Sequence, residues 1–209
     1  MDKKKLYLAS GSFLILLLVG SVLILRLMGP KAPSANIDSP RAKGPKDAPV
    51  QIIEYSDFQC PACRTAQGKL AEMFKQYPGL IRLVYFHFPL EGHKWSPLAH
   101  RAAECAALQN RFWPYHDQLY AEQDAWSKNP EPPIASLLTY AKTSQVANLN
   151  EFARCLADYK TDKPIMQEKE TGLSLGVRST PSFFVNGDSV VGIDLLQAKI
   201  DETRARKKK

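Results

Sequence analysis

The sequence contains few of the residues that usually build a metal centre. It has only four cysteines and four histidines, and no two histidines lie at the i, i+4 spacing of a helical ligand pair. A structural zinc site commonly takes its ligands from closely spaced pairs of cysteines or histidines. Only Cys60 and Cys63 form such a pair, whereas Cys105 and Cys155 are isolated. We therefore predict no metal and no other cofactor, although a mixed site of Cys60, Cys63 and one histidine remains open.

Excess positive charge is absent from the part of the chain that should fold. The net charge is +7, but residues 1–36 carry +4 and residues 204–209 carry +5, which leaves −2 for residues 37–203. A nucleic-acid-binding domain carries its basic residues as a patch or stripe on its folded surface. Nucleic acid is therefore not a predicted partner, and residues 204–209 are interpreted as a solvated basic tail.

One long uncharged run stands near the N-terminus. Residues 6–25 are largely apolar and carry no charge, and about 20 apolar residues are enough to span a bilayer. The lysines at positions 3–5 predict a cytoplasmic N-terminus by the positive-inside rule. We expect residues 1–28 to form a cytoplasmic N-terminus and a single-pass anchor in the cell membrane. The alternative is a cleaved signal peptide, which usually has a shorter apolar core and a small-residue cleavage site.

Both alternatives place the rest of the chain in a periplasmic or otherwise extracytoplasmic compartment. Disulfides form and persist in such compartments. With an even number of cysteines there, we predict a structural disulfide between Cys105 and Cys155. The alternative is that both are small buried residues in an alanine-rich core.

The motif Cys60-Pro61-Ala62-Cys63 carries most of the chemical information. It follows an apolar, strand-like run over residues 50–55 and opens a segment with apolar residues at helical spacing. Pro61 suits the first turn of a helix, where its missing N–H costs nothing. Cys60 would then face the unpaired N–H groups and the positive end of the helix dipole, which favour its thiolate. Cys63, one turn further on, would be the resolving thiol of a reversible dithiol–disulfide centre.

The remaining pattern predicts an α/β fold interrupted by a helical block. Residues 29–48 contain repeated prolines and are interpreted as an extended linker. Residues 80–88 are rich in β-forming residues, so a strand, a helix and a second strand follow in the order of a parallel crossover unit. The pattern is then helical from about residue 93 to 170, and Pro114 is expected to break or kink a helix predicted over residues 97–122.

Strand character returns near the C-terminus. Asn186-Gly187 is a strong two-residue turn signal, and it predicts a hairpin between residues 182–185 and 189–191. A last helix is expected from Asp194 into the basic tail. The folded domain is therefore predicted to span residues 49–203.

These features together resemble the thioredoxin-like fold and, within it, the membrane-anchored DsbA-like thiol:disulfide oxidoreductases. The resemblance covers roughly residues 43–200. The stretches that carry it are Ile53-Glu54-Tyr55-Ser56-Asp57-Phe58-Gln59-Cys60-Pro61-Ala62-Cys63, Phe86-His87-Phe88-Pro89-Leu90, Ala102-Ala103-Glu104-Cys105-Ala106 with Phe112-Trp113 and His116-Asp117, and residues 176–187 around Thr180-Pro181.

The resemblance implies a role for five residues. Cys60 would be the nucleophile and Cys63 the resolving cysteine of a redox disulfide. Pro181 would take the place of a cis-proline facing the dithiol, and with a cis bond the Thr180 backbone would pair with substrate peptide as an added strand. The alternative is that Pro181 only starts an edge strand. Glu54 would occupy the place of a buried acid that exchanges a proton with Cys63. The alternative for Glu54 is a position at the rim of the strand, paired with a lysine such as Lys69.

The resemblance also implies a function. The chain would act as an oxidase, exchanging disulfides with substrate proteins that carry thiols or disulfides, and a membrane redox partner would recycle the dithiol. The strongest oxidants of the family have a histidine between the cysteines, where this chain has Ala62, so a less extreme Cys60 pKa is expected. A reductase or isomerase of the same fold is one alternative. An anchored metal-binding module that uses Cys60 and Cys63 without turnover is another.

Overall fold

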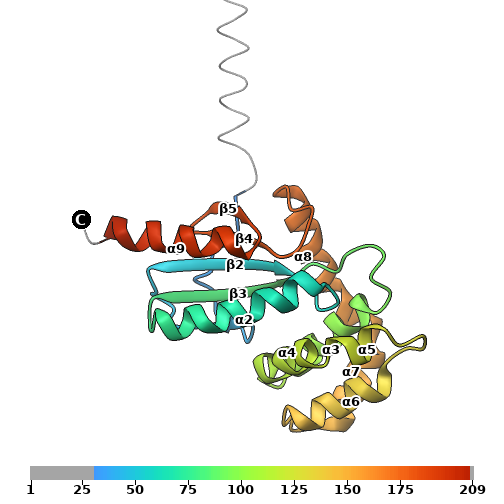
Figure 1. Ribbon diagram of the computed structural model, residues 1–209. Coiled ribbons are helices and arrows are strands. Elements are labelled where there is room, and N and C mark those ends of the chain that lie inside the picture. Colours follow the sequence, from blue (N-terminus) through green and yellow to red (C-terminus); the bar gives the residue numbers. More distant parts are fainter. Residues whose placement is uncertain (1–30, 208–209) are drawn as a thin grey trace, which may run out of the picture. The chain divides into compact units, whose positions relative to one another are not determined.

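The structure is a computed structural model that describes residues 31–207. The predicted anchor over residues 6–25 lies outside these residues, as do the last two lysines. Within the described range, no helix is both long enough and apolar enough to cross a membrane. Figure 1 shows the order of the elements. They are β1 (Ala42–Lys43), β2 (Val50–Ser56), α2 (Pro61–Gln76), β3 (Ile81–His87), α3 (Ser96–Ala107), α4 (Phe112–Ala121), α5 (Gln123–Ser127), α6 (Ile134–Thr143), α7 (Leu149–Ala157), η1 (Tyr159–Thr161), α8 (Asp162–Ser174), β4 (Ser182–Val185), β5 (Asp188–Val191) and α9 (Ile193–Lys207).

The strands form one mixed sheet in the order β1-β3-β2-β4-β5. β2 and β3 run parallel because α2 connects them as a crossover helix, while β4 pairs antiparallel with β2 on its other side. The central strand β2 is therefore covered on both faces, and all of its residues but Gln51 are buried. Glu54, in the middle of β2, lies opposite Tyr85 on β3 and Phe183 on β4.

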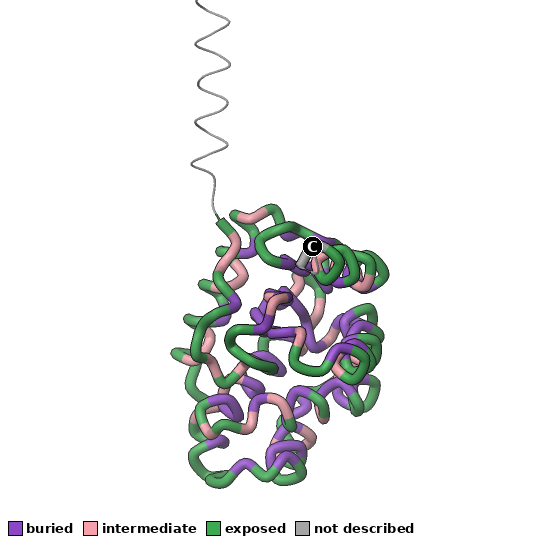
Figure 2. The backbone as a smooth tube through the Cα atoms, turned by 90° about the vertical axis from the view of Figure 1, so that its left-hand side faces the viewer, coloured by how far each residue is buried: buried purple, intermediate pink, exposed green. Residues whose placement is uncertain are grey.

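Helices cover both faces of this sheet. On one face, apolar residues of α2 and α9 such as Leu70 and Leu196 pack against Ile52. On the other face, α8 approaches so closely that a Cβ on Gly172 would lie 2.9 Å from the rings of Tyr55 and Phe88. The strands β2, β3 and β4 are accordingly buried almost throughout, and along the helices buried and exposed residues alternate (Figure 2).

The segment before β2 differs from the extended linker predicted over residues 29–48. Parts of this segment pack on the sheet: Ala35 is buried against it, and Ala42–Lys43 forms an edge strand antiparallel to β3. The guanidinium of Arg82 donates to the main-chain carbonyl oxygens of this segment, including that of Gly44 at 2.7 Å. A buried arginine on β3 thus requires carbonyl partners, and the proline-containing segment supplies them.

The helical block lies between β3 and β4 in sequence and beyond the C-terminal ends of β2 and β3 in space (Figure 1). The prediction that Pro114 breaks a single helix over residues 97–122 is wrong in its position. The break falls between α3 and α4, where Asn110 adopts a positive φ of 56°. Pro114 instead sits in the first turn of α4, where its missing N–H costs no helical hydrogen bond.

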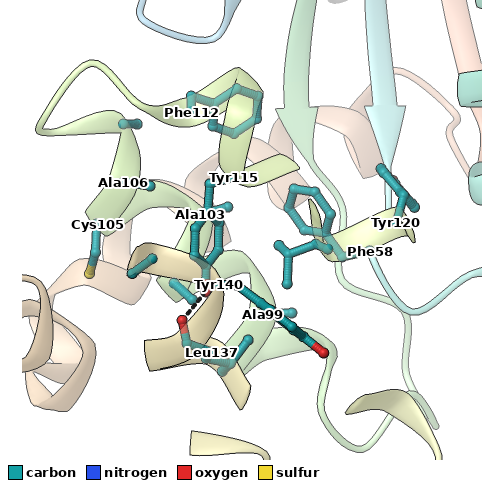
Figure 3. Packing of buried hydrophobic residues seen from close by; sticks show 14 of the residues in the cluster. Phe58, Ala99, Ala103, Cys105, Ala106, Phe112, Tyr115, Tyr120, Leu137 and Tyr140 are labelled. Atoms are coloured by element: carbon teal, nitrogen blue, oxygen red, sulfur yellow. Dashed lines mark hydrogen bonds between the residues drawn. The ribbon is translucent and has the colours of Figure 1, made fainter. Parts of the chain in front are cut away.

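Small and aromatic residues share the core of this block. Figure 3 shows alanines of α3, among them Ala99 and Ala103, beside large aromatic rings. The Tyr115 hydroxyl donates to the carbonyl oxygen of Leu137 at 3.0 Å, so this buried polar group is satisfied. A disulfide between Cys105 and Cys155 joins α3 to α7, with their Cα atoms 5.8 Å apart.

Candidate active site

Cys60 occupies the N-cap position of α2, and Pro61 begins the helix. The side chain of Cys60 is mostly buried, and its sulfur lies 3.5 Å from the carbonyl oxygen of Thr180, to which the protonated thiol donates. The pKa of Cys60 is lowered from 9.0 to about 5, chiefly by a hydrogen bond from the Cys63 thiol. Thr180 and the N–H groups of Cys63 and Ala62 lower this pKa further, whereas burial opposes them. Cys60 therefore carries a thiolate at neutral pH.

Cys63 is the opposite kind of thiol. It is fully buried, and burial together with the neighbouring Cys60 sulfur raises its pKa well above the ordinary value. Both cysteines are free thiols in the structure. The pair therefore divides into one reactive sulfur near the surface and one protonated sulfur behind it, which is the arrangement that attack followed by resolution requires.

The loop before β4 brings Thr180 and Pro181 against Cys60, although they lie 120 residues further along the chain. The Thr180–Pro181 peptide bond is cis. Ser182, the first residue of β4, pairs with Tyr55 on β2, and this register carries the loop to the end of the sheet where α2 begins. The structure thus assembles both halves of the predicted site.

Glu54 is completely buried on β2. Burial raises its pKa from 4.5 to about 7, while the nearby polar side chains of Ser56 and Gln67 oppose this rise. Gln67 Nε2 donates to Glu54 Oε1 at 2.7 Å, and Glu54 Oε2 has no hydrogen-bond partner. The alternative pairing with Lys69 does not occur, because Lys69 binds Asp194 instead.

The acid and the buried thiol share one environment. The charges of Glu54 and Cys63 both raise the pKa of Tyr85, a fully buried tyrosine, and both do the same for Tyr120. The Tyr120 hydroxyl also lies 3.1 Å from Ser56 Oγ, at the end of β2. A carboxyl group whose pKa is near neutral and the thiol that must gain or lose a proton therefore both act on the same two buried tyrosines.

Sequence reasoning missed two residues of this region. Gln67, the hydrogen-bond partner of Glu54, looks like an ordinary polar residue on α2. Asp57 directly follows the buried strand β2 and is itself fully buried. The sequence did contain a signal for Asp57, because it is a charged residue placed between an apolar strand and the cysteine motif. His87, interpreted as a satisfied core or rim histidine, is a core histidine that contacts Glu104 at 3.0 Å.

Metal ligation finds no geometric support in the part of the chain that the structure describes. Within residues 31–207, no three or more His, Cys, Asp or Glu side chains come together as a group that could hold a metal ion.

Comparison with known proteins relates this geometry to a family. A family model described as Thioredoxin matches residues 37–202. The Na(+)/H(+) antiporter NhaA 3 of Salinispora tropica is 38% identical over 165 residues, which are 78% of this chain and 24% of that protein. NhaA 1 of Mycolicibacterium vanbaalenii is 31% identical over 78% of this chain and 25% of its own length. The chain thus spans about a quarter of the length of these curated relatives.

Solved structures extend the comparison to the fold. A thioredoxin-like oxidoreductase from Silicibacter pomeroyi has a TM-score of 0.65 and 27% identity, covering 79% of this chain and 91% of that one. Oxidised BdbD from Bacillus subtilis has a TM-score of 0.67 and 19% identity over 84% and 96% of the two chains. α-DsbA1 from Wolbachia pipientis has a TM-score of 0.69 and 20% identity, covering 87% of this chain and 96% of that one. The chain therefore belongs to the thioredoxin family and has the fold of its DsbA-like thiol–disulfide oxidoreductases.

Proposed function

We propose that this chain is an extracytoplasmic thiol–disulfide oxidoreductase that acts on proteins, with oxidation of substrate thiols as its main direction. The observation that carries the proposal is the asymmetry of the dithiol. Cys60 has a pKa lowered to about 5 and lies against the Thr180–Pro181 loop, while Cys63 is buried with a raised pKa. A low-pKa thiol beside a buried partner is the arrangement of a catalytic dithiol rather than of structural cysteines.

The reaction follows from this geometry. A substrate thiolate attacks the Cys60 sulfur of the Cys60–Cys63 disulfide, the bond between the two cysteines breaks, and Cys63 leaves with the electron pair. A second substrate thiolate then attacks the substrate sulfur of the mixed disulfide and releases the Cys60 thiolate. The substrate loses two electrons and gains a disulfide, and the dithiol gains both electrons. Reduction of a substrate disulfide is the same sequence in reverse, with Cys63 as the resolving thiol.

Glu54 supplies the proton chemistry in this proposal. Cys63 leaves as a thiolate but rests as a thiol, so a proton must reach it in each cycle. With a pKa raised to about 7, Glu54 is present in both protonation states near neutral pH. It can therefore give the proton in one direction and accept it in the other.

The direction of the reaction follows from the stabilised thiolate. A low Cys60 pKa favours the reduced form of the centre and so makes its disulfide an oxidant. Because Ala62 stands where the strongest oxidants have a histidine, we expect a more moderate couple than theirs. A potential about 30 mV lower corresponds to roughly 1.4 kcal/mol less driving force for this two-electron exchange.

Location and partners complete the proposal. Residues 6–25 would anchor the domain in the cell membrane with its N-terminus in the cytoplasm, and a membrane redox partner would reoxidise the dithiol. The Cys105–Cys155 disulfide supports an oxidising compartment.

Two assays on the full chain test the direction. Oxidation of a reduced, unfolded protein and reduction of insulin are compared for the wild type and for Cys60→Ser. We expect the wild type to favour the first reaction and Cys60→Ser to lose both. If insulin reduction predominates, the proposed direction is wrong and the chain acts as a reductase. Absence of both activities, together with stoichiometric zinc or copper in the purified protein, would favour the metal-binding alternative.

A further inference from the structure

Asp57 is a buried carboxylate that the proposed reaction does not use. It lies on the turn between β2 and Cys60 and has no exposed surface. Its Oδ1 accepts hydrogen bonds from the Gln59 N–H and the Ser96 hydroxyl, both at 2.7 Å. Its Oδ2 accepts one from the Leu90 N–H and lies close to His93 Nδ1, both at 2.8 Å. A carboxylate has room for about four such partners, so Asp57 is saturated.

These partners come from three separate segments. Gln59 belongs to the turn that leads to Cys60, Leu90 and His93 lie on the loop after β3, and Ser96 begins α3. Burial alone raises the pKa of Asp57, but His100, the Leu90 N–H and the Ser96 hydroxyl together lower it below its ordinary value. The residue is therefore a charged anchor that fixes one turn to two neighbouring elements.

The main chain of the same residue faces the dithiol. The Asp57 N–H donates to Cys63 Sγ at 3.5 Å. The Asp57 carbonyl oxygen accepts from the Cys60 N–H at 3.1 Å and from the Tyr120 hydroxyl at 3.3 Å. One residue thus contacts both cysteines through its backbone while its side chain is held from four directions.

We propose that Asp57 is a positioning residue for disulfide exchange, and this inference rests on the proposed function. Its carboxylate holds the turn so that its own N–H points at Cys63, where it stabilises the negative charge that develops as Cys63 leaves. In the step concerned, a thiolate attacks Cys60 Sγ, a new sulfur–sulfur bond forms, and the Cys60–Cys63 bond breaks. The electron pair moves to Cys63 Sγ, which then takes up a proton. A preorganised N–H aimed at developing charge accelerates such a step, as in an oxyanion hole.

The test compares two rates in the full chain. The first is the reduction of the Cys60–Cys63 disulfide by glutathione, in which Cys63 is the leaving group. The second is the alkylation of reduced Cys60 by iodoacetamide at a pH well above the Cys60 pKa of about 5, a reaction in which Cys63 is not a leaving group. Asp57→Asn keeps the size of the side chain but turns an amide group toward one pair of its donors, which breaks those contacts.

We expect Asp57→Asn to lower the glutathione rate by about tenfold, since the N–H is displaced rather than deleted. Alkylation of Cys60 should change by less than about twofold, because Cys60 is already a thiolate. Loss of the negative charge of Asp57 would by itself make the approach of the glutathione thiolate easier and the reaction faster. A slower reaction with glutathione therefore indicates that the positioning of the N–H is lost. Asp124→Asn, an exposed aspartate on α5 paired with Arg64 and Lys128, is the matched control and should keep both rates.

Ser96→Ala is the second variant. It removes one of the four partners and leaves the charge of Asp57 in place, and we expect a fall of about threefold in the glutathione rate alone. If Asp57→Asn does not fold, a wild-type glutathione rate in Ser96→Ala overturns the proposal.

Two results with folded Asp57→Asn would also overturn it. One is a wild-type glutathione rate, and the other is an equal fall of both rates, which indicates general loosening of the site. Failure of the proposed function looks different. The wild type would then not exchange disulfides with proteins, while the ratio of glutathione rates between variant and wild type would still decide the role of Asp57.

Discussion

Glu54→Gln should change how the stability of the protein depends on pH. Glu54 is fully buried, and its pKa rises from 4.5 to about 7 on folding because burial disfavours the charged form. Glutamine has nearly the same shape but does not titrate. Its carbonyl oxygen can still accept the hydrogen bond that Gln67 Nε2 now donates to Glu54 Oε1. The substitution therefore removes the titration with little change in packing.

The magnitude follows from the two pKa values. Below pH 4.5 the carboxyl is protonated in both states and contributes no pH dependence. As the pH rises, the unfolded chain loses its proton first, and the folded protein keeps it until the pH reaches about 7. Stability therefore falls across this interval. At roughly 1.4 kcal/mol for each tenfold change in the protonation equilibrium, the total loss is about 3 kcal/mol.

Urea unfolding of the oxidised protein across this pH range measures the effect. Oxidation removes the titration of Cys60 and Cys63, and neither cysteine is among the causes of the raised Glu54 pKa. Subtracting the Glu54→Gln curve from the wild-type curve should leave a loss of about 3 kcal/mol between pH 4.5 and 7. Glu72→Gln, an exposed position on α2, is the control and should retain the wild-type slope. Parallel curves for wild type and Glu54→Gln would refute the reasoning.

Three further predictions concern other parts of the structure. The thiolate absorbance of the reduced protein should titrate with a midpoint near 5, and Ala62→His should lower this midpoint. A wild-type midpoint near 3.5 would contradict the expectation that Ala62 leaves the Cys60 pKa less extreme than in the strongest oxidants. Replacing Cys105 and Cys155 together by alanine should lower the free energy of unfolding by up to about 4 kcal/mol for a loop of 50 residues, measured in urea. Detection of two free thiols there in the native protein would remove the basis for this expectation. Gly172→Ala should cost about 1–3 kcal/mol, because its Cβ would lie 2.9 Å from two aromatic rings; unchanged thermal stability would show that α8 shifts freely.

The features that the sequence predicted well are those with short-range signals. The order strand, Cys60-Pro61-Ala62-Cys63 and helix depends on adjacent residues, and so does the hairpin at Asn186-Gly187, which connects β4 to β5. The α/β class with a helical block follows from the run of helical periodicity between two stretches of strand character. Each single element in these patterns is identified from about 20 neighbouring residues or fewer, where local propensity and periodicity are informative.

The features that escaped prediction depend on contacts between distant segments. β1 is only two residues long and forms because β3 pairs with it, while Arg82 on β3 binds the carbonyl oxygen of Gly44 directly after it. Gln67 and Lys69 both lie on α2, and only the packing shows that Gln67 faces Glu54. Asp57 gathers donors from the loop after β3 and from α3, about 40 residues away at most. Periodicity identifies buried faces but does not identify the partner of a buried polar group.

In the proposed reaction, the Cys60–Cys63 disulfide passes to protein thiols through Cys60. Rapid mixing of the oxidised full chain with a reduced, unfolded protein, followed by acid quenching and mass spectrometry of the peptides, tests it directly. We expect a transient mixed disulfide on Cys60, then a reduced Cys60–Cys63 pair and one new disulfide in the substrate for each pair reduced, with Cys105–Cys155 intact. A substrate that keeps all its thiols, or an adduct found only on Cys105 or Cys155, would contradict it.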